Sequence, residues 1–255
     1  MRQNKASFRV VLILAMTASC AHAQFASPNS AKAAIDAAIH AKFYLNQASL
    51  PLDLILPTPP AKNSAIALSE LVELHQIEEK RTPEQVAQAQ VDDHEESIFL
   101  FASVMGTQFN ADALPLTSAL SKRIRKDESE ASSGLKSTYH RPRPYQADTT
   151  LHPVCTVTRE PNSYPSGHSL SGYLLGFVLI QMVPERRQQI LDRADQFAHN
   201  RLVCGVHYAS DTEASRRLAY ALFGSLTASP QFQKDLAAAR DETRQRLGLP
   251  AAINR

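Results

Sequence analysis

The feature that most constrains the fold is an apolar run at residues 169–182, interrupted only by scattered polar residues. Its apolar residues do not alternate with polar ones, so it is typical of a buried helix rather than a half-buried strand. Most other apolar residues also recur at helical spacing. We therefore predict an all-α fold, organised as one helical bundle, and the chain is long enough to bury a sizeable core. No apolar run reaches the length that crossing a bilayer requires.

Several further segments are expected to be helical from their apolar spacing, and a Thr82 cap followed by Pro83 marks one start. In one of these helices, residues 64–80, Leu68, Leu71 and Val72 should form the buried stripe, with Glu70 largely off it. The proline-rich residues 48–63 should be extended. The predicted helices are residues 30–46, 64–80, 83–91, 98–105, 114–136 (with a possible break near 132–134), 185–200, 212–227 and 231–247.

A Pro-Ser-Gly-His sequence precedes the apolar run. It places Ser166, Gly167 and His168 at the start of the predicted helix. Unpaired amides and the helix dipole favour an anion at such a place, so His168 would face a bound anion. The alternative from these residues alone is a Pro-Ser helix cap beside a surface histidine.

A second histidine lies four residues before a carboxylate, His207 and Asp211. On a helix the two would share a face, and the carboxylate could accept from Nδ1–H and leave the other nitrogen free to attack. Gly205 could turn the chain so that Arg201 approaches the same place. An ordinary His–Asp cap with an exposed arginine is the alternative.

A third segment supplies two more cations, Lys136 and Arg143. Pro142 and Pro144 exclude a regular helix there, so we expect an extended loop after a helix that ends near Lys136. Arginine can bind phosphate oxygens through two donors, and lysine adds a point charge. A solvated basic loop is the alternative.

Together, Lys-x6-Arg-Pro, Pro-Ser-Gly-His and Arg-x5-His-x3-Asp resemble the three-part signature of the PAP2 phosphatase superfamily. That superfamily includes bacterial class A nonspecific acid phosphatases, membrane phosphatidate phosphatases and vanadium haloperoxidases. The resemblance covers residues 136–211 and implies a helical bundle of the PAP2/haloperoxidase type. One departure is Asn200, where the third motif usually has serine, and it bears on the positioning of Arg201.

The resemblance also implies roles for the residues. His207 would attack phosphorus to form a phosphohistidine, Asp211 would orient it, and His168 would protonate the leaving alcohol. The phosphoryl oxygens would be bound by Lys136, Arg143, Arg201, the Ser166 hydroxyl and the Gly167 amide. Because these groups stabilise the charge that phosphoryl transfer requires, we expect no metal and no cofactor. Small phosphate monoesters are the expected substrates, and related soluble enzymes form homo-oligomers.

Residues 1–23 have the pattern of a signal peptide: a positive start, a short apolar stretch and a small-x-small site ending at Ala23. The phosphatase domain would then be residues 24–255, in a periplasmic or secreted protein. Lipoprotein processing at Cys20 is a less favoured alternative. The formal net charge of +2 falls to −1 once this segment, with its three cations, is removed. That balance gives no basic excess for nucleic acid.

Two cysteines remain after the signal, Cys155 and Cys204. In an oxidising compartment they could form a disulfide, and two buried free thiols are the alternative. The acidic cluster at residues 92–96 could bind a divalent ion. We favour instead a solvated helix start, whose dipole attracts acids.

Two other function classes stay open at this point. A vanadium-dependent haloperoxidase would hold vanadate in the same pocket, although the chain is short for one. A noncatalytic phosphate-binding protein would need neither the two histidines nor Asp211.

Overall fold

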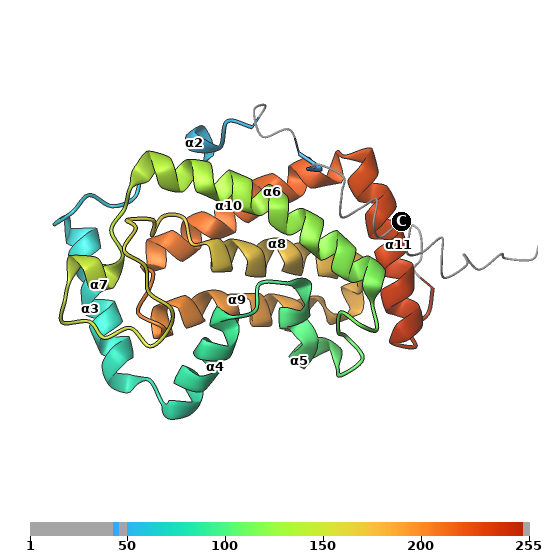
Figure 1. Ribbon diagram of the computed structural model, residues 1–255, viewed down its shortest axis with the longest axis horizontal. Helices are drawn as coiled ribbons and strands as arrows, with labels where there is room; N and C mark the ends of the chain where they lie inside the picture. The colour runs from blue at the N-terminus through green and yellow to red at the C-terminus, as the bar shows by residue number, and fades with distance from the viewer. Residues whose placement is uncertain (1–42, 46–49, 252–255) are drawn as a thin grey trace, which may run out of the picture.

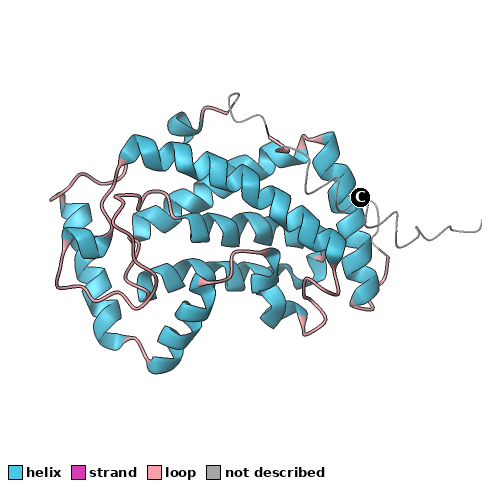
Figure 2. Cartoon of the chain, viewed as in Figure 1, coloured by secondary structure: helices cyan, strands magenta, loops and turns pink. Residues whose placement is uncertain are grey.

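The computed structural model describes residues 43–45 and 50–251. Every regular element in that part of the chain is a helix (Figure 2), which confirms the predicted all-α fold. The expected signal peptide, Cys20 and most of the helix predicted at 30–46 lie outside the described residues. None of the helices within the described ranges is both long and apolar enough to cross a membrane.

The centre of the bundle is α8 (Gly167–Met182), the helix predicted from the apolar run. It packs against α6 (Pro115–Tyr139), α9 (Arg187–Val203), α10 (Ala209–Thr227) and α11 (Pro230–Arg246) (Figure 1). A helix that is apolar on all sides is expected to be surrounded in this way. Gly172 permits the close contact with α9, because a Cβ there would lie 2.8 Å from a ring carbon of Phe197.

The other helices are shorter or lie around this core. Ser64 caps α3, and Thr82 forms a capping box with Gln85 at the start of α4, as predicted for residue 82. Their bounds are α2 (Leu52–Ile55), α3 (Ala65–Lys80), α4 (Pro83–Asp93), η2 (Ile98–Phe101), α5 (Ala102–Met105), α7 (Pro144–Ala147) and η3 (Pro184–Arg186). The single turn of α2 interrupts the segment that we expected to be extended.

Helix α6 is longer than predicted and has no break at residues 132–134. Ala131 and Leu135 pack into the core on either side of that stretch, and this packing keeps it helical. The helix ends at His140, which has a left-handed φ of 45°. Lys136 therefore lies in the last helical turn rather than in the loop after it.

Helix α3 has a different buried face from the predicted one. Leu68 and Val72 are 51% and 56% exposed, whereas Glu70 and Leu74 are buried. The predicted stripe is therefore wrong. The inner face carries a carboxylate because a buried arginine of the 140–166 connection, Arg141, lies against it.

Candidate active site

The three motif segments converge at one end of the bundle, where the 140–166 connection, which contains α7, runs beside α3 (Figure 1). Lys136 lies in the last turn of α6, Gly167 begins α8, and a Cβ on Gly167 would lie 3.9 Å from the Lys136 ammonium nitrogen. His207 lies in the short connection between α9 and α10. The predicted site residues are thus brought together from segments far apart in the chain.

The amino end of α8 has the predicted form. Ser166 is the N-cap, and its Oγ accepts hydrogen bonds from the Ser169 amide at 3.3 Å and the Ser169 hydroxyl at 3.0 Å. Gly167 and His168 follow in the first turn, where backbone amides are left without a helical partner. Because the Ser166 oxygen is already a helix cap and fully buried, its structural role is evident before any ligand binds.

His207 and Asp211 are paired, but not across a helical face. Gly205, at φ 72°, turns the chain after α9, and α10 begins only at Ala209. The Asp211 carboxylate accepts from the Tyr208 amide at 2.9 Å and from the His207 Nδ1–H at 3.2 Å. The carboxylate therefore caps α10 and orients the imidazole at the same time.

The tautomer of His207 follows from its two partners. Nδ1 faces a carboxylate, whereas Nε2 lies 2.9 Å from a guanidinium nitrogen of Arg143. A guanidinium can only donate, so Nε2 presents its lone pair and Nδ1 carries the hydrogen. Arg143 is held by the Val206 carbonyl at 2.9 Å and the Asn162 side chain at 2.9 Å. The lone pair of Nε2 thus faces a fixed cation.

The charges of this site shift several pKa values. Burial and then the cations Arg143, Arg201 and Lys136 hold the pKa of His207 well below its ordinary value. Burial, together with Arg143, lowers the pKa of Lys136 to about 8. Burial raises the pKa of Asp211 to about 6 against the opposing effect of a neighbouring arginine. A neutral His207 surrounded by cations suits attack on an anion.

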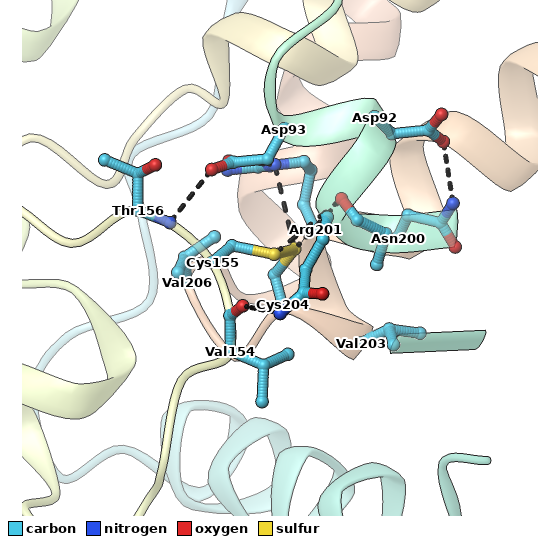
Figure 3. Close-up of a disulfide and its surroundings, with 12 residues drawn as sticks. Asp92, Asp93, Val154, Cys155, Thr156, Asn200, Arg201, Val203, Cys204 and Val206 are labelled. Atoms are coloured by element: carbon cyan, nitrogen blue, oxygen red, sulfur yellow. Dashed lines mark hydrogen bonds and ion pairs between the residues drawn. A yellow bond between two sulfur atoms is a disulfide. The ribbon is translucent and has the colours of Figure 1, made fainter. Parts of the chain in front are cut away.

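Arg201 is held by a carboxylate that sequence reasoning did not assign to the site. One guanidinium nitrogen lies 2.7 Å from Asp93 Oδ1 (Figure 3), and the side chains of both residues are only 3% exposed. The buried Nε of Arg201 has no hydrogen-bond partner in the described part of the chain. An unpaired buried donor is costly, and a bound anion could satisfy it.

The acidic cluster at 92–96 is the end of α4, not a solvated helix start, so that interpretation is wrong. The Asp92 and Asp93 side chains are buried because arginines lie against them, whereas the Glu96 side chain is 37% exposed. Asp92 forms a two-point contact with Arg193, at 2.6 and 2.9 Å, and accepts from Asn200 at 2.7 Å. Asn200 therefore fixes the end of α4 next to Asp93 (Figure 3).

His168 contacts the same segment through both ring nitrogens. Nδ1 lies 3.1 Å from Glu96 Oε1, and Nε2 lies 3.1 Å from the Asp93 carbonyl. Burial and then Arg201 lower its pKa to about 4, although Glu96 acts in the opposite direction. A leaving group would have to replace one of these acceptors to receive a proton.

Cys155 and Cys204 form a disulfide with an S–S distance of 1.98 Å (Figure 3). Next to it, the Thr156 amide donates to Asp93 Oδ2 at 2.9 Å, and the Val154 amide donates to the Cys204 carbonyl at 3.1 Å. Asp93 lies close to both sulfurs, but sulfurs bonded to each other are not thiolate ligands. The disulfide therefore ties the 140–166 connection to the end of α9.

Other buried partners of the site were missed by sequence reasoning. Arg141 and Ser163 both bind the Asp211 carboxylate, each at 2.6 Å. Arg141 directly precedes Pro142 and lies two residues before the predicted phosphate ligand Arg143, and this position was a signal that could have indicated it. Glu70 and Glu96 had none, because charged residues on helices and turns are usually solvated.

Comparisons with known proteins agree with this geometry. Residues 116–235 match the family model described as the PAP2 superfamily. The non-specific acid phosphatase of Salmonella typhi is 34% identical over 154 residues, which cover 59% of this chain and 62% of that protein. The acid phosphatase of Zymomonas mobilis subsp. mobilis is 32% identical over 147 residues, which cover 56% of this chain and 55% of that protein.

A solved structure was also found, described as the first transmembrane PAP2 type phosphatidylglycerolphosphate phosphatase from Bacillus subtilis. It has 17% sequence identity and a TM-score of 0.45, covering 68% of this chain and 88% of that one. The chain spans about three-fifths of the length of the curated relatives it matches. All three motif segments fall inside the region that matches the PAP2 superfamily model.

Proposed function

We propose that this chain is an acid phosphatase that hydrolyses phosphate monoesters through a phosphohistidine intermediate. The observation that carries the proposal is the lone pair of His207 Nε2, which is buried beside cations and oriented by Asp211. Binding alone would not need an oriented nucleophile. The matched relatives, named acid phosphatase or non-specific acid phosphatase, support the same class of reaction.

In the first step, the Nε2 lone pair of His207 forms a bond to phosphorus and the ester P–O bond breaks. His168 gives its proton to the departing alkoxide, which leaves as the alcohol. In the second step, water loses a proton to His168 and attacks phosphorus, the P–N bond breaks, and phosphate is released. Arg143, Arg201 and Lys136 stabilise the negative oxygens in both steps.

We further propose that no metal takes part, because three cations and the amino end of α8 can supply the charge stabilisation. The test is hydrolysis of p-nitrophenyl phosphate by the purified protein, dialysed against EDTA. Turnover should be unchanged by EDTA, and vanadate should inhibit competitively. Loss of activity on chelation that a divalent ion restores would contradict metal independence, and absence of hydrolysis under all conditions would contradict the function itself.

Export is a separate proposal, supported by the sequence of residues 1–23 alone. The mature protein should begin at Gln24 and be released with the periplasmic or secreted fraction. Intact-mass measurement of the purified chain tests this directly. If the mass instead shows a lipid-modified Cys20 at the amino terminus, the chain is processed as a lipoprotein and cleavage after Ala23 is contradicted.

A further inference from the structure

A line of buried charges runs from α3 to the candidate nucleophile. Glu70 Oε2 accepts from Arg141 at 2.9 Å, and another nitrogen of Arg141 donates to Asp211 Oδ1 at 2.6 Å. Asp211 in turn holds His207. From the sequence, Glu70 was expected to lie off the buried face of α3. It also lies outside the three motifs, which therefore do not explain this contact.

The first two members of this line are rigidly held. Glu70 and Arg141 are 6% and 7% exposed. The second oxygen of Glu70 accepts from the Ser210 amide at 2.6 Å, and the Arg141 guanidinium lies 3.9 Å from the centre of the Tyr208 ring. The first contact joins α3 to the residue before Asp211, and the second places Arg141 against Tyr208, the N-cap of α10. The arrangement is therefore fixed relative to the carboxylate that it contacts.

The charges on this line have opposite effects on Asp211. Burial alone would favour its protonated form. Arg141 stabilises the carboxylate, and Glu70 partly offsets Arg141 because it places a second negative charge on the same guanidinium. The other titratable or charged groups facing Asp211 are Lys136, Arg143, Tyr164, His207 and Tyr208. None of these bridges Asp211 to a second carboxylate as Arg141 does.

We propose that Arg141 and Glu70 are positioning residues that set, in opposite directions, the pH at which the Asp211–His207 pair loses its reactive state. The proposal rests on the proposed function, in which Asp211 must be ionised and His207 must keep its lone pair. Removing the positive charge should make protonation of the pair easier. Removing the negative charge should make it harder.

The first experiment measures the acid limb of kcat/KM for p-nitrophenyl phosphate. Arg141→Gln should move this limb to higher pH by about one unit, the scale of a lost opposite charge. Glu70→Gln keeps the shape of the side chain and should move the limb to lower pH by roughly half a unit. The shift is smaller because the Glu70 charge reaches Asp211 only across Arg141. Glu73→Gln is the matched control: an exposed glutamate on the same helix, which should leave the limb in place.

Arg141→Lys provides a rescue, because one ammonium keeps the charge but cannot bridge two carboxylates as a guanidinium does. Its limb should lie between those of wild type and Arg141→Gln. A merely structural role would lower activity at all pH values without opposite shifts. Shifts in the same direction, or none, would overturn the proposal. If Arg141→Gln does not fold, Glu70→Gln decides alone, and an unmoved or raised limb overturns it.

A readout independent of activity separates this inference from the proposed function. NMR titration of the His207 imidazole should show its pKa raised in Arg141→Gln and lowered in Glu70→Gln. Opposite shifts in a protein that hydrolyses no phosphate ester would leave the inference standing and contradict the function. If the wild type hydrolyses phosphate esters but the two variants shift neither the acid limb nor the His207 pKa in opposite directions, the proposed function stands and this inference is contradicted.

Discussion

The region that matches the PAP2 superfamily model, residues 116–235, and the helices before it, α3 and α4 with the turn that follows, contribute different groups to the same site. The matched region supplies the histidines and cations of the three motifs, which would contact the phosphate. The preceding segment supplies carboxylates that pair with residues of the matched region: Glu70 with Arg141, Asp93 with Arg201 and Glu96 with His168. One region is built for the ligand, and the other balances charge.

This comparison identifies the cations that no carboxylate of the described residues neutralises and that could therefore bind phosphate. Arg141 is paired with carboxylates on both of its arms, and Arg201 on one. In the part of the chain that the structure describes, no carboxylate forms an ion pair with Lys136 or Arg143. Their mutual repulsion in a buried place is unfavourable, and a bound phosphate would relieve it.

The largest expected effect comes from a residue of the matched region, His207. His207→Ala should lower kcat by at least about a thousandfold, since a covalent mechanism loses its nucleophile. Phosphate should still bind, as followed by a thermal shift, because the cations remain. His199→Ala, an exposed histidine on α9, is the matched control and should keep full activity. Turnover of the His207 variant within tenfold of wild type would contradict the assignment.

The disulfide joins the 140–166 connection to α9 next to Asp93, where the two regions meet. Cys155 and Cys204 are 49 residues apart in sequence, and closing such a loop stabilises the folded state by about 4 kcal/mol in the chain-entropy model. Reducing agent should therefore lower the melting temperature. If mass measurement finds both thiols alkylated without prior reduction, the bond is absent from the protein in solution.

Asp93→Asn tests the carboxylate side of the comparison. The amide keeps the shape of the side chain but cannot form an ion pair with Arg201. The Arg201 guanidinium should therefore be less well aligned with the phosphoryl oxygens in the transition state. We expect kcat to fall about tenfold, with KM unchanged or lower because one negative charge near the phosphate is gone. Asp112→Asn, at an exposed site, is the control. A raised KM with normal kcat would mean that Asp93 acts on ground-state binding only.

The smallest expected effect is in the pH profile. His168 must be protonated to act as the acid, and its pKa in the empty site is lowered to about 4 by burial and Arg201. A bound phosphoryl group adds negative charge and raises that pKa. The alkaline limb of kcat should therefore lie roughly one unit above that of kcat/KM, with the maximum on the acid side of neutrality. Coincident limbs would show that the substrate does not act on His168.

His168→Ala sharpens this test through the leaving group. Alkyl phosphates should lose far more activity than p-nitrophenyl phosphate, because nitrophenolate departs without a proton. Equal losses for both esters would exclude His168 as the acid.

The sequence predicted the helices and the convergence of the motif residues well, because apolar spacing and cap residues act locally. It failed where the outcome depends on distant partners. Glu70 lies 71 residues before Arg141, and Asp93 lies 108 residues before Arg201. Nothing in the local sequence distinguishes these two acids from a solvated glutamate or aspartate. The pairing of His207 with Asp211 was predicted from helical spacing, yet it arises from a helix cap, since Gly205 turns the chain first.

The buried Nε of Arg201, which has no hydrogen-bond partner among residues 43–45 and 50–251, has a thermodynamic consequence for handling the protein. A ligand that satisfies this donor binds only the folded chain, so inorganic phosphate should stabilise folding by mass action. At a concentration of 100 times its dissociation constant the gain is about 2.7 kcal/mol. The melting temperature of this protein is therefore a property of its buffer as well as of its sequence, and it should rise with the logarithm of the phosphate concentration.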